Sequence, residues 1–459
     1  MFIFLIKAVP AHKRLRVVVG LLILFFVVSL FMVDLDSDQE SLSDQTDLSM
    51  GSSPSEMESG GSGDTSSIPS ALAQLSHNKV ATGYKYKVFL YEDDLPKLIY
   101  GDLKRDTHCQ NEYSGVEALF PQVLKKLDVY TRFGDIADYY VVPVMTECFL
   151  SKSLLAGKDF NRAVNELNSL FETTLDEIQS SYPYWSRTEG RDHIFIFPSE
   201  RGPSLLNEGN MLRIKKSIFL TGLTVYKPSV FEPWKDIVVP AWRTNGSGVI
   251  PAAESNSTNG TAAPAASRDI FVHFRGTVPG LEDKQPSGLT HELQKAVNDS
   301  STKMKGKVVF KELDDEVDVM QEMLRSTFCL CPGGDFEGWS LRLYRAISAG
   351  CIPVIVADNV ELPFVQLVDY SKFSVKILEK DSLALPKLLN EIKEERIRGK
   401  QKAIEKIADR FSWTYFTEDS EGKSSWKPST ALDSLLHILH LKLRFMRNSP
   451  YHFWLKEET

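Results

Sequence analysis

The sequence predicts an α/β protein made of two domains with alternating strands and helices, preceded by a membrane-spanning helix and a flexible stem. Three observations lead to this fold class. Short runs of Val, Ile, Leu and Phe alternate with amphipathic segments of helical spacing, a pattern typical of parallel sheets covered on both faces. The pattern stops in a polar loop near residues 245–261 and then restarts. The chain of 459 residues is long enough for two domains of ordinary size.

An apolar segment close to the N-terminus, Val17–Val33, has no charged residue and the length of a short membrane-spanning helix. A cleaved signal peptide is the alternative, but the segment is longer than a usual signal-peptide core and no small-residue cleavage pattern follows it. Basic residues precede the segment, and only acidic ones follow it up to residue 78. The positive-inside rule therefore predicts a cytosolic tail at residues 1–16, a single-pass type II anchor at 17–33 and a lumenal body.

Residues 34–79 are predicted to form a flexible acidic stem. They are rich in Ser, Gly, Asp and Glu and contain too few apolar residues to bury a core. Four N-glycosylation sequons follow in the body, at Asn245, Asn256, Asn259 and Asn298. Three of them lie in the polar loop that separates the two α/β patterns, where a glycan meets little steric hindrance. Together with the predicted topology, the sequons favour a compartment of the secretory pathway.

The first α/β domain is predicted at residues 80–240 and the second at 241–429. In the first domain, apolar runs predict strands at 87–91, 137–144 and 193–198, and helical spacing predicts helices at 113–127 and 160–179. In the second, the predicted strands are 270–274, 308–310, 327–331 and 352–356, and the predicted helices are 316–326, 340–349 and 384–411. Residues 430–459 begin with an amphipathic helix at 430–447, which could pack back on the first domain.

Charge and cysteine content exclude some functions. The formal net charge is −8 and no basic tract follows residue 16, which argues against a nucleic-acid-binding protein. The five Cys residues form no C-x-x-C pair, so a structural zinc site is not expected. In an oxidising lumen Cys329 could pair with Cys351, and Cys109 with Cys148, which would leave Cys331 free. The sequence does not settle this pairing.

Candidate site residues follow the predicted strands, because open parallel sheets bind ligands beyond the carboxyl ends of their strands. In the first domain these positions hold acidic residues, namely Glu92, Asp93, Asp94, Glu147 and Glu200. In the second domain they hold Arg275, Gly333, Gly334 and Asp358. This division is expected if a carboxylate on one domain activates an acceptor while Arg side chains and backbone N–H groups on the other bind an anionic diphosphate.

The segment 328–358 carries the most specific pattern. A strand runs into a Gly-rich turn, Ser340 stands at the expected N-cap of the next helix, and Arg342 can add a bidentate hydrogen-bond donor for phosphate. Gly333 and Gly338 have the spacing of a Walker A loop, but Trp339 replaces its essential Lys, which argues against ATP hydrolysis. A tight turn without a ligand is the alternative interpretation.

Several motifs of this chain together resemble the exostosin-type glycosyltransferases, which include plant cell-wall members. They occur in the family's order over about residues 85–375 and are Y-P-Y-W at 182–185, G-R-D-H at 190–193, K-D-I-V-V-P at 235–240, F-R-G at 274–276, F-C-L-C-P-x-G at 328–334, S-x-R-L at 340–343, A-G-C-I-P-V-I-V-A-D at 349–358 and L-P-F at 362–364. The resemblance implies an inverting glycosyltransferase of the GT-B architecture, in which two Rossmann-like domains face each other across a cleft. It also implies a type II protein of the Golgi membrane.

The resemblance assigns roles to the candidate residues. Inversion needs a general base; Glu200 is the first candidate because the family has an acidic residue about there, and Glu147 is the second. The leaving nucleotide diphosphate would be stabilised by Arg275, Gly334, Ser340 and Arg342. No D-x-D pair ends a strand of the second domain, so no metal or other cofactor is expected. The expected partners are a nucleotide-sugar, in particular a UDP-sugar, a glycan or polysaccharide acceptor, the Golgi membrane and related glycosyltransferases as oligomer partners.

One position departs from the family. Arg345 stands where the family usually has an acidic residue suited to ribose hydroxyls, and an Arg side chain cannot accept their hydrogen bonds. The alternative function is therefore a non-catalytic glycan-binding or partner subunit of a glycosyltransferase complex. His193 opens a strand, away from its carboxyl end, so a structural role is favoured over catalysis.

The predicted topology can be tested by protease digestion of sealed vesicles that carry the full-length protein. We expect residues 80–459 to be protected because the positive-inside rule places them in the lumen. Peptide N-glycosidase should then lower the apparent mass of the protected fragment. Digestion of the body from the cytosolic side would contradict both the anchor and the use of the sequons.

Overall fold

The computed structural model describes residues 79–92, 95, 103–110, 114–199, 201–222, 230–242, 268–276, 288–312, 318–333, 341–413, 416–418 and 424–448. The predicted anchor at 17–33 and the stem up to residue 78 lie outside these residues, as do the sequons at Asn245, Asn256 and Asn259. Asn298 is described and is exposed near the end of a helix. Among the described helices, none has the length and apolarity needed to cross a bilayer.

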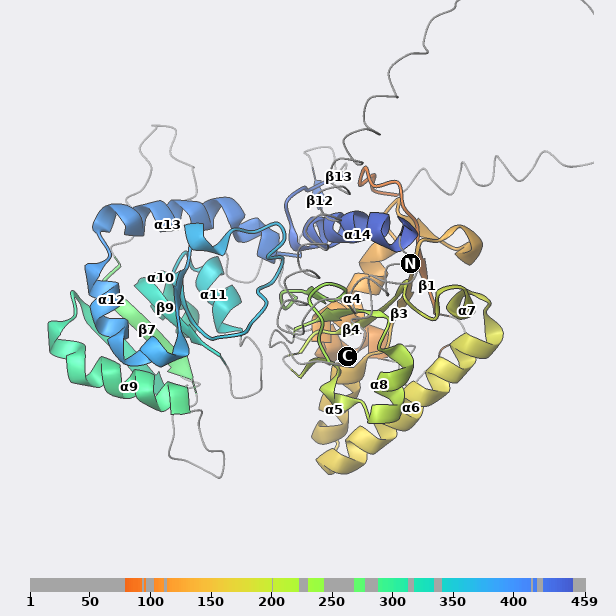
Figure 1. Ribbon diagram of the computed structural model, residues 1–459, viewed down its shortest axis with the longest axis horizontal. Helices are drawn as coiled ribbons and strands as arrows, with labels where there is room; N and C mark the ends of the chain where they lie inside the picture. Colours follow the sequence, from red (N-terminus) through yellow and green to blue (C-terminus); the bar gives the residue numbers. More distant parts are fainter. Residues whose placement is uncertain are drawn as a thin grey trace, which may run out of the picture. The chain divides into compact units, whose positions relative to one another are not determined.

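The first domain is built on a six-stranded sheet in which every strand pair is parallel (Figure 1). Its order is β2-β1-β3-β4-β5-β6, with β1 at Val88–Leu90, β2 at Tyr130–Thr131, β3 at Tyr139–Val142, β4 at His193–Phe197, β5 at Ile218–Thr221 and β6 at Ile237–Val238. The α-helices are α4 at Ser114–Leu124, α5 at Thr146–Leu155, α6 at Phe160–Ser181, α7 at Tyr184–Thr188 and α8 at Glu208–Ile214. The short 3-10 helices are η1 at Leu103–Arg105, η2 at Thr107–Gln110, η3 at Gly134–Ile136 and η4 at Gly202–Leu205.

The second domain is built on a five-stranded parallel sheet of order β11-β10-β9-β7-β8. Its strands are β7 at Ile270–Gly276, β8 at Lys307–Glu312, β9 at Ser326–Pro332, β10 at Ile352–Val356 and β11 at Val375–Ile377. The α-helices are α9 at Gly288–Ser300, α10 at Val319–Leu324, α11 at Arg342–Ser348, α12 at Leu385–Glu391 and α13 at Glu394–Ile407. The short 3-10 helices are η5 at Ser301–Lys303, η6 at Tyr370–Lys372, η7 at Glu379–Ala384 and η8 at Ala408–Phe411.

The predicted class of two parallel-sheet α/β domains is confirmed, and each predicted strand and helix corresponds to an element of the structure. One predicted helix is divided: residues 384–411 contain α12, α13 and η8, and α12 is separated from α13 because Ile392 and Lys393 take extended backbone angles. Within the two domains the sequence did not predict helices α5, α7, α8 and α9 or strands β2, β5, β6 and β11. Strands β2 and β6 are two residues long, and α5 buries Thr146 and Ser153 beside apolar side chains, which hides its helical spacing.

The residues of β3 alternate between two apolar layers, as expected for a strand buried on both faces. Tyr139 and Val141 pack in a cluster with α4, while Tyr140 and Val142 pack in a second cluster with α5 and α6. All four side chains are buried. This continuous burial explains why the strand has no polar alternation in the sequence.

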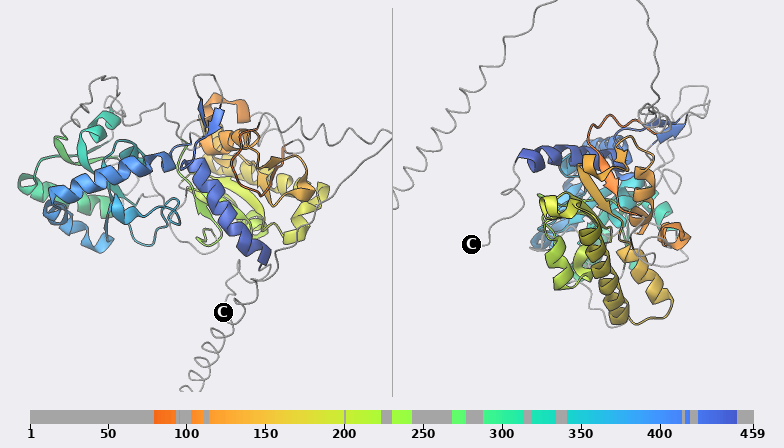
Figure 2. Two further views of the ribbon diagram at one scale, coloured as in Figure 1. Left: turned by 90° about the horizontal axis from the view of Figure 1, so that it is seen from above. Right: turned by 90° about the vertical axis from the view of Figure 1, so that its right-hand side faces the viewer.

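The segment that follows α13 returns to the first domain. Trp413 is buried, stacks on Trp242 with ring centres 4.9 Å apart, and donates its indole N–H to the Pro240 carbonyl at 3.1 Å. After the β12 (Phe416–Glu418) and β13 (Ser424–Trp426) hairpin, helix α14 (Ala431–Asn448) lies along the first domain (Figure 2). The hydroxyls of Tyr86 and Tyr139 donate to main-chain carbonyls of α14 at 2.9 and 2.7 Å.

Two disulfides are formed, Cys109–Cys148 and Cys329–Cys351, which are the two pairings that the sequence left open. Cys331 is buried and carries a free thiol. Burial raises the pKa of this thiol to about 12, so it stays protonated and behaves as a small apolar side chain.

The contact between α4 and Trp242 predicts a selective effect of a small substitution. A Cβ atom on Gly115 would lie 2.6 Å from the Cβ of Trp242, so Gly115→Ala should destabilise the protein by about 1 to 3 kcal/mol through overpacking. The matched control is Gly399→Ala in α13, where a Cβ would meet no atom within 4 Å. That change should stabilise the protein by about 0.5 to 1 kcal/mol. Thermal unfolding measures both, and equal effects at the two positions would contradict the packing described.

Candidate active site

Both sheets have one topological switch point, where consecutive connections leave in opposite directions. In the first domain the chain passes from β1 to β2 on one side and then to β3 on the other. In the second it passes from β7 to β8 and then to β9. Ligands of open parallel sheets bind beyond the carboxyl ends of the strands at such points. The residues after β1 and β3, and those after β7 and β9, therefore occupy the expected ligand-binding positions.

Glu147 lies in the first turn of α5, a few residues after the end of β3. Its Oε1 atom contacts Nη1 of Arg201 at 3.1 Å, and its side chain is 13% exposed. Within the described part of the chain its other oxygen, Oε2, is buried and has no hydrogen-bond partner. Glu200, the first candidate base, lies outside the described residues. The next residue in the sequence, Arg201, contacts Glu147.

Glu117 of α4 belongs to the same group, although it was not among the candidate residues predicted from the sequence. Its carboxyl accepts hydrogen bonds from the Thr146 hydroxyl at 2.9 Å and from the backbone N–H groups of Glu147 and Cys148 at 3.1 and 3.2 Å. Complete burial raises the pKa of Glu117, the nearby Glu147 charge adds to this rise, and these hydrogen bonds oppose it, so that the pKa is about 8. An acidic residue between Val116 and Ala118 in an apolar helix was the available signal.

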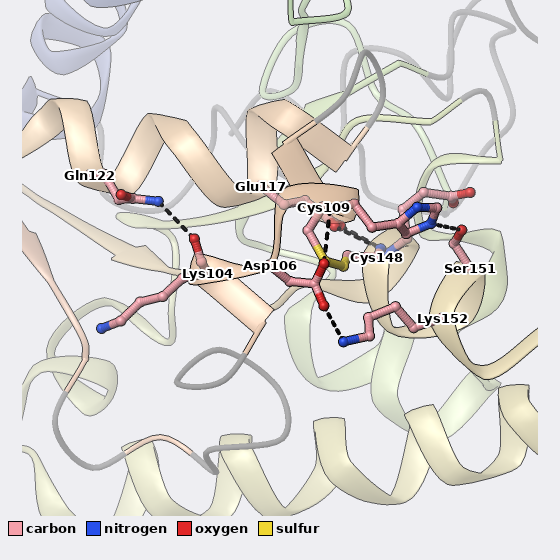
Figure 3. The surroundings of a disulfide bond; sticks show 10 residues. Lys104, Asp106, Cys109, Glu117, Gln122, Cys148, Ser151 and Lys152 are labelled. Carbon is pink, nitrogen blue, oxygen red and sulfur yellow. Dashed lines mark hydrogen bonds and ion pairs between the residues drawn. A yellow bond between two sulfur atoms is a disulfide. The ribbon is translucent and has the colours of Figure 1, made fainter. Parts of the chain in front are cut away.

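The first two turns of α5 are also tied to η2 and to Asp106, which directly precedes η2 (Figure 3). Cys148 forms the disulfide with Cys109, Ser151 contacts Nε2 of His108 at 2.9 Å, and Lys152 forms an ion pair with Asp106. These contacts join residues that are 39 to 46 positions apart in the sequence. The start of α5, and with it the backbone of Glu147, is therefore held from two sides.

Arg275 is the penultimate residue of β7 and forms a bidentate ion pair with Glu322 of α10. Its Nε and Nη2 atoms donate to the two carboxylate oxygens at 2.6 and 3.0 Å, and Nε2 of His273 lies 3.0 Å from the same carboxylate. The guanidinium holds the pKa of Glu322 down to about 2. Glu322 thus orients the Arg275 side chain at the end of β7, a role that no pattern in the sequence predicted.

Arg342 is the first residue of α11, and its guanidinium also reaches the end of β7. The guanidinium carbon lies 5.0 Å from the centre of the Phe274 ring. A Cβ atom on Gly276 would lie 2.5 Å from Nη1 of Arg342, so only a residue without a side chain permits this approach. The structure therefore brings two predicted phosphate ligands, Arg275 and Arg342, to the same strand end. Gly334 and Ser340 lie outside the described residues, and α11 follows Leu341, whose side chain makes no cap.

The neighbouring strand β10 ends beside this group. The Gly333 N–H donates to the Val356 carbonyl at 2.9 Å, which joins the ends of β9 and β10. Asp358 follows β10, its N–H donates to the Glu379 carboxylate at 2.9 Å, and its Oδ1 atom is buried without a partner in the described structure. Arg345 lies in α11, so no carboxylate occupies that family position. Among the described residues, no group of three or more His, Cys, Asp or Glu side chains could hold a metal ion.

His193 is fully occupied by structural contacts. Its ring nitrogens lie 2.8 Å from the Asp192 carboxylate and 2.9 Å from the Tyr91 hydroxyl, and the side chain is buried. Burial lowers its pKa, although Asp192 acts in the opposite direction. These contacts support the structural role expected from its position at the start of β4.

Comparison with known proteins gives the class and the family. The model of the Exostosin GT47 domain matches residues 83–392. An Arabidopsis thaliana protein named as a probable glucuronoxylan glucuronosyltransferase is 28% identical over 374 residues, which are 79% of this chain and 76% of that protein. An Arabidopsis thaliana protein named as a probable beta-1,4-xylosyltransferase is 29% identical over 324 residues, or 70% of this chain and 75% of that protein. A solved structure titled "Crystal Structure of TarM" covers 50% of this chain and 54% of its own at 10% identity, with a TM-score of 0.28.

These matches define the protein as a glycosyltransferase. Within that class, the chain belongs to the exostosin GT47 family, as its motifs predicted.

The pair between Arg275 and Glu322 predicts a pH-dependent contribution to stability. Because the pKa of Glu322 is lower in the folded protein, the contribution is complete above the ordinary value near pH 4.5 and is lost as the pH falls toward 2. Arg275→Ala should therefore lower the free energy of unfolding at pH 7 by about 1 to 2 kcal/mol, a range reduced for solvent screening. It should also flatten the decline of stability between pH 4.5 and 2. Denaturant unfolding across this range tests the pair, and an unchanged profile would contradict it.

Proposed function

We propose that this glycosyltransferase is an inverting enzyme of the GT-B architecture that uses a nucleotide-sugar donor and a polysaccharide or glycan acceptor. The nucleotide that we propose is UDP. One observation carries the proposal: a carboxylate with an unpartnered buried oxygen in the described structure follows the switch point of one parallel sheet, and the side chains of Arg275 and Arg342 lie at the end of β7, at the switch point of the other. The charges are thus divided as donor and acceptor chemistry requires.

On the donor side, Arg275 and Arg342 are proposed to bind the diphosphate. Guanidinium groups form bidentate, charge-assisted hydrogen bonds with phosphate oxygens, and these bonds strengthen as the leaving group gains negative charge. Glu322 orients the guanidinium of Arg275, and the Phe274 ring lies against that of Arg342. Gly334 and Ser340 are proposed to add backbone N–H donors from the segment that leads into α11.

On the acceptor side, a carboxylate is proposed to act as the general base. It takes the proton of the acceptor hydroxyl while the acceptor oxygen bonds to the anomeric carbon of the donor. The bond from that carbon to the diphosphate oxygen breaks, and its electron pair leaves with the nucleotide diphosphate. We assign this role to Glu147, because its Oε2 atom has no partner in the described structure. Glu200 becomes the second candidate because it directly precedes Arg201.

The relatives' names suggest where to search for substrates. They name glucuronosyl and xylosyl transfer and, in one case, glucuronoxylan, so UDP-glucuronic acid and UDP-xylose are the first donors to test. We propose no metal requirement. We further propose that residues 17–33 anchor the enzyme in the Golgi membrane with its body in the lumen, and that related glycosyltransferases are its oligomer partners.

A panel of nucleotide-sugars incubated with xylan-type and other oligosaccharide acceptors tests the reaction, with UDP release as the signal. Glu147→Gln should reduce turnover by about 10²- to 10⁴-fold, the usual contribution of a general base, and leave UDP affinity unchanged. Arg342→Ala should weaken UDP binding by about 1.5 to 3 kcal/mol in calorimetric titration.

Two results would overturn parts of this proposal. A protein that binds glycans but gives no heat with UDP would favour the non-catalytic partner subunit that Arg345 suggests. Full turnover of Glu147→Gln, with loss of turnover in Glu200→Gln, would move the base to Glu200.

A further inference from the structure

The start of α5 has an unusual cap. The first N–H groups of an α-helix have no partner within the helix, and the usual partner is the side chain of the residue just before it. Met145 precedes α5 and its side chain makes no such bond. The carboxyl of Glu117, about thirty residues earlier in the sequence, binds the N–H groups of Glu147 and Cys148 instead.

The cap also holds a side chain. Thr146, the first residue of α5, is buried and donates its hydroxyl to the same oxygen of Glu117 that accepts the Glu147 N–H. Glu117 is itself completely buried. A buried carboxyl with three hydrogen bonds cannot rotate without leaving polar groups unsatisfied, which is costly in an apolar layer. The backbone of Glu147 is therefore fixed by its hydrogen bond to the Glu117 carboxyl.

The fixed backbone of Glu147 matters because it determines where the carboxylate oxygens of Glu147 lie. One of its oxygens contacts Arg201, and the other is the buried atom that has no partner in the described part of the chain. The direction of that second oxygen depends on the backbone of residue 147 and on the Arg201 contact. A displacement of about 1 Å at a reacting group can lower a rate by about 100-fold.

We propose that Glu117 is a positioning residue for the acceptor side of the active site, which fixes the first turn of α5 and thereby aims the carboxylate of Glu147. This inference rests on the proposed function, because it gives Glu117 a purpose only if Glu147 acts on the acceptor. The proton that Glu117 retains through burial supports it: a neutral Glu117 adds no second negative charge beneath Glu147.

A graded series of variants in the full-length protein tests this inference. Glu117→Gln keeps a carbonyl that can accept from Thr146 and Glu147, so we expect kcat to stay within about fivefold of wild type by analogy with single neutral hydrogen bonds. Glu117→Met keeps the length of the side chain but removes every oxygen acceptor, and kcat should fall by about 10- to 100-fold. The KM for the donor should not change in either variant.

Asp159→Ala is the matched control. Asp159 caps α6 by accepting two backbone N–H groups, and it is exposed and outside the proposed site. The Asp159→Ala substitution should lower thermal stability but leave kcat unchanged. If Glu117→Met does not fold, the double variant Glu117→Gln with Thr146→Val replaces it. This variant also lacks the hydroxyl donor, so its kcat should lie between those expected for Glu117→Gln and Glu117→Met. A folded Glu117→Met variant with wild-type kcat would overturn the inference.

Hydrogen exchange separates this inference from the proposed function. Amides of residues 145–150 should exchange faster in Glu117→Met than in wild type, whether or not a donor sugar has been found. Slower or unchanged exchange would overturn the positioning role alone. Faster exchange in the variant, when the wild-type protein transfers no sugar from any donor, would instead overturn the proposed function and, with it, the catalytic purpose of the cap.

Discussion

The parallel pairing of strands is the constraint on which the rest of this structure depends. Parallel neighbours need a crossover between them, so helices must cover both faces of each sheet and every strand must end at the same edge. The two-layer burial of β3 is one result. The contact of Glu147 with Arg201 is another, and so is the presence of both Arg275 and Arg342 at the end of β7, because in each case segments distant in sequence reach the same strand edge.

The two strand edges differ in how they treat charge. On the first domain, burial keeps Glu117 neutral near neutral pH while Glu147 beside it is paired with a cation. On the second, Glu322 carries a full negative charge because Arg275 holds its pKa down to about 2. A neutral acid thus supports the proposed base, and an ionised acid supports the proposed phosphate ligand. In both cases a carboxyl group that is not proposed to contact the substrate, Glu117 or Glu322, orients a side chain that is.

The sequence predicted the strand-end residues but not their supports. Glu147, Arg275 and Arg342 could be found because each follows, ends or begins a recognisable element. Glu117 and Glu322 could not, because their partners lie about thirty and forty-seven residues away and no local pattern encodes such a contact. Helix α5 was missed for a related reason: tertiary contacts hold its polar buried face. Glu200, Gly334 and Ser340 remain predictions, since they lie outside the described residues.

The return of the chain at Trp413 has a consequence for biosynthesis. Helix α14 covers the first domain, yet it is synthesised only after the whole second domain. Until then the hydroxyls of Tyr86 and Tyr139 lack their acceptor carbonyls in α14, and the apolar surface around them lacks the helix that covers it. The first domain is therefore begun first but can be completed only after the second domain has been synthesised. Until residues from 431 onward have been synthesised, this apolar face stays uncovered, and exposed apolar surface of this kind is what chaperones bind.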